Sequence, residues 1–313
     1  MGVEGIQGLH HVTALAGDPR GNLGFYREVL GLRLVKRTVN FDDPGAYHLY
    51  YGDALGRPGT LLTFFPWPGA RPGQVGAGQV AVTAFTIPAA AIGYWQERLQ
   101  AHGVAVERIA PRFQEEEVVL GFRDPDGLAL ELVAHPRAEE RAGWPDGPVP
   151  PDAAIRGLHA VTLLEAVGEP TLRFLIEGMG FRVEREEGDR IRLQVGPGGP
   201  GAWMDLWIDP RASRGRVAVG TVHHVAWRVA NEADQGAWRT HLQAWGLYVT
   251  PVMDRKYFRS IYFREPGGVL FEIATDPPGF TVDEPPERLG TGLMLPDWLE
   301  PQRGEIERAL PPL

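Results

Sequence analysis

Gly220-Thr-Val-His-His-Val-Ala-Trp227 is the stretch that decides the fold, because Gly8-Leu-His-His-Val-Thr13 near the N-terminus is nearly a copy of it. Each stretch puts two histidines into an apolar run that is typical of a β-strand. A third strand-like run, Gly267-Gly-Val-Leu-Phe-Glu-Ile-Ala274, carries Glu272 between apolar residues. An unpaired carboxylate in such a strand would be costly, so we expect a cation beside it, either a metal ion or an arginine.

The strand at Gly8 opens a unit that recurs along the chain. It leads through Asp18-Pro19, a helix-start signal, into a segment with apolar residues at helical spacing, and three strand-like runs follow. The same order begins again at Gly78, Gly157 and Gly220. The sequence therefore predicts an α+β fold of four βαβββ modules.

The four modules divide into two halves. Residues 143–152, which are rich in Pro and Asp, are typical of a linker between the halves. We predict an N-terminal domain of two modules over residues 1–142, a C-terminal domain of two modules over residues 153–275, and a tail over residues 276–313. The tail is rich in Pro and Glu, and we expect it to wrap the second half without contributing to the chemistry.

Composition excludes several classes of function. The 313 residues carry a net charge of -9, which disfavours a surface that binds nucleic acid. The absence of cysteine excludes disulfides, thiolate zinc sites and a cysteine nucleophile, so any metal must be held by His and carboxylate. No apolar run is long enough to span a membrane, and we expect a soluble cytoplasmic protein.

Aligning the modules gives two columns of equivalent positions, and each column can line one face of a sheet. The column on the first strands holds His11, Ala81, Ala160 and His224. The column on the last strands holds Thr63, Glu131, Asp205 and Glu272.

Two pairings of the modules compete. If modules one and four pair, the columns bring together His11, His224 and Glu272, and the cavity of modules two and three keeps acids without an imidazole and is vestigial. If modules three and four pair, the set is Asp205, His224 and Glu272, with His159 just off register. Spacing alone leaves both open, and we favour the first because it uses both His-His-Val copies.

Two histidines and one carboxylate suit a non-haem Fe(II) that binds an organic substrate and O2 at its open positions. Mn(II) fits the same ligands, and a zinc site of a lyase or isomerase is a further reading. The carboxylate offsets part of the metal charge, and neutral imidazoles leave the ion acidic enough to bind a phenolate.

The chain resembles the vicinal-oxygen-chelate superfamily of glyoxalases, fosfomycin-resistance proteins and extradiol dioxygenases. Within it, the chain is most similar to the hydroquinone-cleaving dioxygenases. The matching segments lie at both ends and along much of the chain: Gly8-Leu-His-His-Val-Thr13, Leu34-Val-Lys-Arg-Thr38, Tyr47-His-Leu-Tyr-Tyr51, Gly59-Thr-Leu-Leu-Thr-Phe-Phe-Pro66, Asp254-Arg-Lys256 and Ser260-Ile-Tyr-Phe-Arg-Glu-Pro-Gly-Gly-Val-Leu-Phe-Glu272.

The resemblance implies two tandem glyoxalase-like domains with curved mixed sheets and outer helices. It also implies Fe(II) held by His11, His224 and Glu272, and Tyr262 near a substrate oxygen. Residues that support this site would be His10, Thr13 and His223. A basic residue would approach the substrate, and Arg255, Lys256 and Arg259 are the candidates.

Strand geometry tests these supporting roles. Thr13 shares its strand face with His11, whereas His10 and His223 alternate to the opposite face of a regular strand and need a bulge or an indirect contact. The remaining histidines, taken as surface or structural, are His48, His102, His135 and His241. Glu131 and Asp205 are expected as relics or as buried groups paired with Arg.

We therefore predict an Fe(II)-dependent ring-cleaving dioxygenase that acts on a hydroquinone or catechol with O2, and a homo-oligomer is compatible with the sequence. The first alternative is a glyoxalase-like isomerase or lyase with another divalent metal. That chemistry wants a second carboxylate where Thr63 stands, which counts against it. The second alternative is a metal-free protein that sequesters an aromatic or drug-like molecule.

Overall fold

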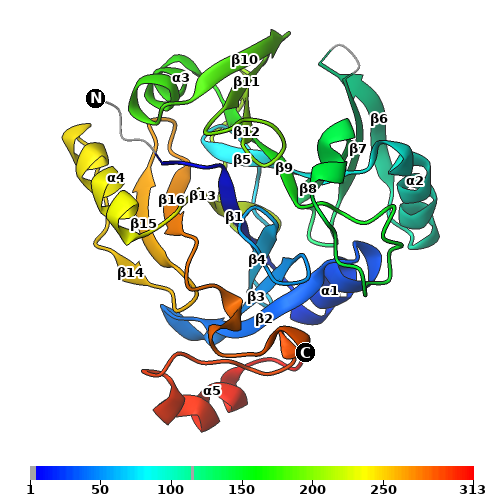
Figure 1. The fold of residues 1–313 in the computed structure, drawn as a ribbon, viewed down its shortest axis with the longest axis vertical. Coiled ribbons are helices and arrows are strands. Elements are labelled where there is room, and N and C mark those ends of the chain that lie inside the picture. The colour runs from blue at the N-terminus through cyan, green and yellow to red at the C-terminus, as the bar shows by residue number, and fades with distance from the viewer. Residues whose placement is uncertain (1–4, 114–115) are drawn as a thin grey trace.

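The computed structural model describes residues 5–113 and 116–313. Each module has the predicted order of one strand, one helix and three strands (Figure 1). The elements of module one are β1 (Leu9–Ala16), α1 (Pro19–Gly24), β2 (Arg33–Asn40), β3 (Asp43–Gly52) and β4 (Leu61–Pro66). Those of module two are β5 (Gln79–Ile87), α2 (Ile92–Ala101), β6 (Val106–Arg112), β7 (Glu117–Arg123) and β8 (Ala129–Ala134).

The second half repeats this order. The elements of module three are β9 (Leu158–Glu165), α3 (Glu169–Arg173), β10 (Arg182–Glu187), β11 (Arg190–Gln194) and β12 (Trp203–Ile208). Those of module four are β13 (Val222–Val229), α4 (Glu232–Ala244), β14 (Met253–Asp254), β15 (Arg259–Arg264) and β16 (Leu270–Thr275). The Asp18 side chain caps α1, and the Asn231 side chain caps α4, as their residue types favour.

Two curled mixed sheets of eight strands form the molecule, and each takes one module from either half of the chain. The first sheet has the order β14-β15-β16-β13-β1-β4-β3-β2 and joins modules one and four. The second has the order β10-β11-β12-β9-β5-β8-β7-β6 and joins modules two and three. This is the pairing that we favoured from the sequence.

Within each sheet the two modules meet at an antiparallel pair of strands, and each pair contains two register shifts. Between β1 and β13 the shifts skip His10 on one strand and His223 on the other. Between β5 and β9 the skipped residues are Ala81 and His159. A bulge of this kind places an additional residue opposite one partner and redirects its side chain. The bulge that His10 and His223 required is therefore present on both strands.

The bulges also correct the alignment of module two. Counted from the skipped residue, the position equivalent to His11 and His224 is Val82, not Ala81. The interval from the opening glycine is one residue longer in modules two and four than in modules one and three. A count from the glycines alone therefore gives the wrong register for module two.

Helices cover the outer faces of the sheets (Figure 1). Apolar side chains of the strands, such as Val12 and Trp227, pack in one core with helix residues such as Trp95 and Trp238. The opposite faces carry the polar columns. No helix of the described part of the chain is long and apolar enough to cross a membrane.

The tail, with its helix α5 (Arg303–Ala309), lies largely against module one, contrary to the expectation that it wraps the second half (Figure 1). The buried ammonium of Lys36 lies 2.6 Å from Asp283 and 2.5 Å from Glu284, both in the tail. A buried lysine needs such partners, so Lys36 fixes the tail across β2. Asp283 also accepts a hydrogen bond from Tyr257 of module four.

Candidate metal centre

Three side chains from three strands converge where the first sheet joins its two modules. The Nε2 atoms of His11 on β1 and His224 on β13 lie 3.2 Å apart. The Oε2 atom of Glu272 on β16 lies 3.3 Å from the first and 3.0 Å from the second. All three residues are buried. Two imidazole nitrogens and a carboxylate oxygen thus face one common point.

This donor set fits a divalent cation. Glu272 accepts a 2.5 Å hydrogen bond from Ser260 at Oε1, but its Oε2 is buried and has no hydrogen bond of regular geometry within the described residues. A buried carboxylate oxygen without a partner costs free energy that a bound cation would offset. Burial would raise the pKa of Glu272, but the nearby His11 and His224 hold that pKa well below its usual range, so the group is an anion at neutral pH.

The two bulged histidines hold the rings of this set. The Nδ1 atoms of His10 and His11 lie 2.9 Å apart, and those of His223 and His224 lie 2.8 Å apart. Each contact engages the ring nitrogen that faces away from the common point, which orients Nε2 toward it. Burial lowers the pKa of His10 well below its usual value and lowers that of His223 to about 3, so both rings are neutral at pH 7.

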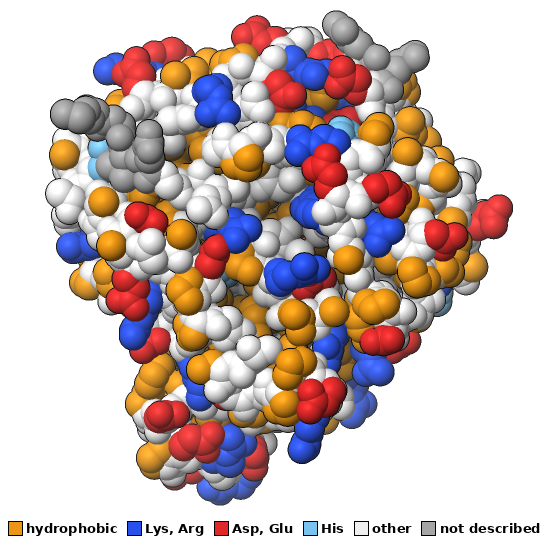
Figure 2. All heavy atoms as spheres, viewed as in Figure 1, with side chains coloured by type: hydrophobic (Ala, Val, Ile, Leu, Met, Phe, Trp, Pro, Cys, Tyr) orange, Lys and Arg blue, Asp and Glu red, His pale blue; other side chains and the backbone are white. Residues whose placement is uncertain are grey.

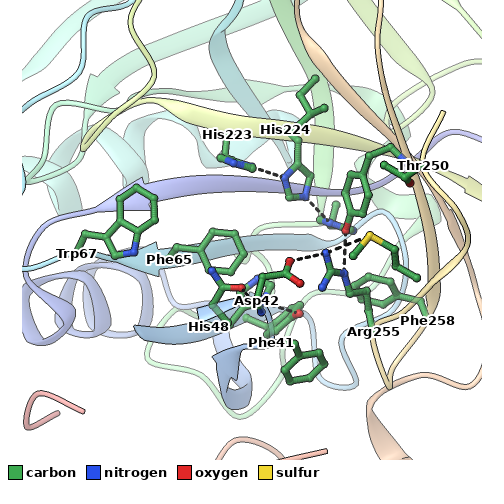
Figure 3. Close-up of a pocket in the computed structure, with 16 residues that line it drawn as sticks. Phe41, Asp42, His48, Phe65, Trp67, His223, His224, Thr250, Arg255 and Phe258 are labelled. Atoms are coloured by element: carbon green, nitrogen blue, oxygen red, sulfur yellow. Dashed lines mark hydrogen bonds and ion pairs between the residues drawn. The ribbon is translucent and has the colours of Figure 1, made fainter. Parts of the chain in front are cut away.

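A cavity of about 360 Å³ opens beside the three donors (Figure 3). Phe65 and Trp67 line one side of it, and Phe258 lies across the cavity from them. Its wall is mainly apolar and aromatic, with polar groups near the donors. Such a cavity suits a planar apolar ring that carries a few oxygens.

Tyr262, which the resemblance puts near a substrate oxygen, lines this cavity, and its ring contacts that of His224 edge to face. Its hydroxyl accepts a 3.2 Å hydrogen bond from Nε of Arg255. Burial, and then the charge of Glu272, raise the pKa of Tyr262 above its usual value, so it keeps its proton.

Arg255 is the basic residue at the cavity among the three candidates. Its guanidinium is also bound by Asp42, at 2.9 Å. Lys256 instead donates to the carbonyl of Leu295, and Arg259 pairs with Asp254, so both are directed away from the cavity.

His48, which the sequence suggested to be surface or structural, lies on the cavity wall together with Tyr50. Its Nε2 lies 2.8 Å from the hydroxyl of Thr63, which is 2.8 Å from the hydroxyl of Thr13. Thr13 is thus buried beside the donors but directed to Thr63. The sequence signal that associates His48 with Tyr50 is the alternation of residues on β3, which puts both side chains on one face of the strand.

In the second sheet Val82 and Ala160 occupy the positions of His11 and His224, and arginines from other strands pair with the acids. Asp205 accepts a 2.7 Å bond from Arg192, and Glu131 accepts a 2.7 Å bond from Arg112. Glu117 joins this network by binding both arginines and His159. The alternative set with Asp205, His224 and Glu272 is therefore wrong, because Asp205 lies in the other sheet. The two acids are paired with Arg, as expected.

Comparisons with known proteins agree with this architecture. Residues 8–132 and 157–273 match the Glyoxalase/Bleomycin resistance protein/Dioxygenase superfamily model. The chain is 48% identical to a Bacillus subtilis protein named as a ring-cleaving dioxygenase, MhqO, over 97% of this chain and 96% of the relative. It is 36% identical to the chlorohydroquinone/hydroquinone 1,2-dioxygenase of Sphingobium indicum, over 98% of this chain and 97% of the relative.

Solved structures show the same fold. A crystal structure of a Bacillus subtilis protein described as a dioxygenase superimposes with a TM-score of 0.94 at 47% identity, covering 99% of this chain and 98% of that one. Glyoxalase I from Zea mays gives a TM-score of 0.63 at 16% identity, covering 86% of this chain and 92% of that one, which speaks for the fold alone.

Proposed function

The chain belongs to the glyoxalase/bleomycin resistance protein/dioxygenase superfamily, and we propose that it is an Fe(II)-dependent ring-cleaving dioxygenase for a hydroquinone or catechol. One observation carries this proposal: His11, His224 and Glu272 converge on one point, and the two histidines line an aromatic cavity. The hydroquinone activity in the name of the Sphingobium relative favours a diphenol as substrate.

His11, His224 and Glu272 would hold the metal, and Mn(II) fits the same donors. Bound Fe(II) would supply a Lewis acid for the phenolate and a one-electron route between the ring and O2. His10 and His223 keep the two ligand rings in place through their Nδ1 atoms. Ser260 holds the carboxylate of Glu272 through Oε1 and leaves Oε2 free for the ion.

The cavity contributes position and a dry environment. Phe65, Trp67 and Phe258 would pack against the ring and exclude water, which strengthens every polar contact inside. Tyr262 retains its proton and accepts a bond from Arg255, so its hydroxyl can donate to a substrate oxygen that gains negative charge. Arg255 adds a fixed positive charge at the same wall.

The test is O2 uptake after anaerobic reconstitution with Fe(II), using hydroquinone, methylhydroquinone and catechol as substrates. Glu272→Gln removes the carboxylate of the centre, and Glu131→Gln removes the equivalent carboxylate of the second sheet as the matched control. We expect uptake that requires iron and a diphenol, is lost in Glu272→Gln and persists in Glu131→Gln.

Other outcomes would favour the alternatives. Binding of another divalent metal without O2 uptake would point to an isomerase or lyase. The absence of any metal binding would point to a protein that sequesters aromatic molecules.

A further inference from the structure

Tyr50 is the module-one counterpart of Tyr262. On the first sheet Tyr262 pairs with Glu272 in register, and Tyr50 pairs in the same way with Thr63, the equivalent of Glu272. Two residues earlier, Ser260 bonds to Glu272 and His48 bonds to Thr63. Both tyrosines line the cavity. The pseudo-symmetry thus puts a second phenol on the wall of the proposed active site.

Three hydrogen bonds connect Tyr50 to the region of the metal centre. They run from the hydroxyl of Tyr50 to Nδ1 of His48, from Nε2 of His48 to the hydroxyl of Thr63, and from there to the hydroxyl of Thr13. Each bond is 2.8 Å long. Because the neutral imidazole carries one hydrogen, the two bonds of His48 must point in the same direction along the chain, and if Thr63 donates to His48 then Thr13 must donate to Thr63.

Burial selects this direction. If His48 instead donates to Thr63, one hydroxyl hydrogen of Thr63 or Thr13 is left over, yet both residues are fully buried and neither hydroxyl has another acceptor among the described residues. A buried donor without a partner costs about 1–3 kcal/mol. If the bonds point toward Tyr50, every hydrogen up to the phenol has an acceptor, and the free O–H belongs to a residue of the cavity wall.

The charge states agree with this direction. Burial lowers the pKa of His48 well below its usual value, so the imidazole is neutral at pH 7 and carries one hydrogen. Burial, and then the neighbouring Tyr262, raise the pKa of Tyr50 well above its usual value, so the phenol keeps its proton.

We propose that the hydroxyl of Tyr50 donates a hydrogen bond to an oxygen of the aromatic molecule in the cavity, and that His48 and Thr63 are positioning residues that leave this proton free. His48 then carries its hydrogen on Nδ1. The inference rests on the proposed function for the class of ligand, a diphenol, but the direction of the bonds can be measured without turnover.

The first test is anaerobic binding of hydroquinone to the Fe(II)-loaded protein, measured by calorimetry. Tyr50→Phe should weaken binding about twofold to tenfold, the effect of one hydrogen bond between neutral groups. The matched control is Tyr51→Phe, since the Tyr51 hydroxyl donates to Asn22 and does not line the cavity. Equal binding by the two variants would overturn the role of Tyr50.

The second test separates the chain of bonds from an isolated tyrosine. In Thr63→Val the imidazole is free to move its hydrogen to Nε2 and accept from Tyr50, which withdraws the phenol proton from the cavity. This variant should therefore weaken binding by up to the effect of Tyr50→Phe, the double variant should bind no more weakly than Tyr50→Phe alone, and Thr63→Ser should bind as wild type. Additive effects would contradict the chain.

The third test needs no substrate. Nitrogen-15 NMR of the Zn(II)-loaded protein should show His48 neutral with its hydrogen on Nδ1, and hydrogen on Nε2 would overturn the proposed direction. If wild type takes up no O2, the proposed function is refuted but the role of Tyr50 is not. The tautomer of His48 and the binding of hydroquinone by Tyr50→Phe are both measured without turnover.

Discussion

The two sheets have the same architecture but differ in the groups that face their buried carboxylates. Both have a bulge on each of two central strands and an acid at an equivalent position of a last strand. In the second sheet, Asp205 and Glu131 are neutralised by Arg192 and Arg112 from the chain itself. In the first, the Oε2 atom of Glu272 faces the imidazoles of His11 and His224, and no lysine or arginine of the described residues pairs with it.

The side chains that face the buried acid decide whether a repeated module can hold a metal. A guanidinium satisfies a buried carboxylate with a permanent charge and directed hydrogen bonds, and it fills the space that an ion would need. An imidazole leaves a lone pair directed at that space. The second sheet lacks imidazoles at these positions, which hold Val82 and Ala160, and arginines from β6 and β11 pair with its acids instead.

The largest effect on stability should come from the second sheet. Arg192→Met would leave Asp205 and Glu117 buried without their shared cation, which costs about 3–5 kcal/mol for a broken buried pair. Urea unfolding measures this loss. The control Arg123→Met breaks an exposed pair with Glu107 and should cost under about 1 kcal/mol. Similar losses of unfolding free energy in the two variants would show that the buried network contributes no more stability than an exposed ion pair.

Metal should stabilise the first sheet and leave the second unaffected. At a free Fe(II) concentration a hundred times the Kd, anaerobic addition should raise the free energy of unfolding by about 2.7 kcal/mol. His224→Gln should abolish the increase, whereas His135→Gln, which removes a buried imidazole near the second sheet, should preserve it. An increase that survives in His224→Gln would place the ion elsewhere.

The network of the second sheet should weaken in acid. Burial would raise the pKa of Asp205, but Arg192 and then Arg112 hold it below its usual range. A carboxyl with a lowered folded pKa stabilises the protein above its unfolded pKa of about 3.9, and this stability is lost as pH falls through the folded value. Asp205→Asn should therefore cost stability at pH 7, and the difference from wild type should shrink below about pH 4. A pH-independent difference would contradict this pairing.

The smallest effect is expected for the arginine at the cavity of the first sheet. Asp42, which binds Arg255, has a side chain that is 60% exposed, and pairs of this kind contribute about 0–1 kcal/mol. Asp42→Asn should raise the KM for hydroquinone by at most about fivefold without loss of folding. Asp43→Asn, an exposed neighbour, is the matched control. A larger change in KM would mean that Asp42 does more than orient Arg255.

Much of the fold could be predicted because the repeat is visible in the chain. The His-His-Val copies located β1 and β13, and the apolar spacing located the strands and helices that follow. Spacing left two pairings open, and the pairing of modules one and four was favoured because it uses both His-His-Val copies. The structure brings His11, His224 and Glu272 together, and their binding of a metal stays a prediction, as do the domain limits.

The missed features depend on three-dimensional context. A bulge adds one residue without changing composition, so the alternation of residues on a strand cannot reveal that Val82 occupies the position assigned to Ala81. Alternation on β3 puts His48 and Tyr50 on one face, but nothing in one sequence distinguishes whether that face is a cavity wall or a surface. The place of the tail depends on Lys36, whose need for a partner becomes visible only once its burial is known.

The most direct test of the account is a crystal structure of the Fe(II)-loaded protein, with anomalous scattering recorded on both sides of the iron absorption edge. We predict one iron peak per chain, between Nε2 of His11, Nε2 of His224 and Oε2 of Glu272, and none beside Asp205 or Glu131. The absence of iron at the first sheet, or a second peak among the arginines of the other sheet, would contradict it.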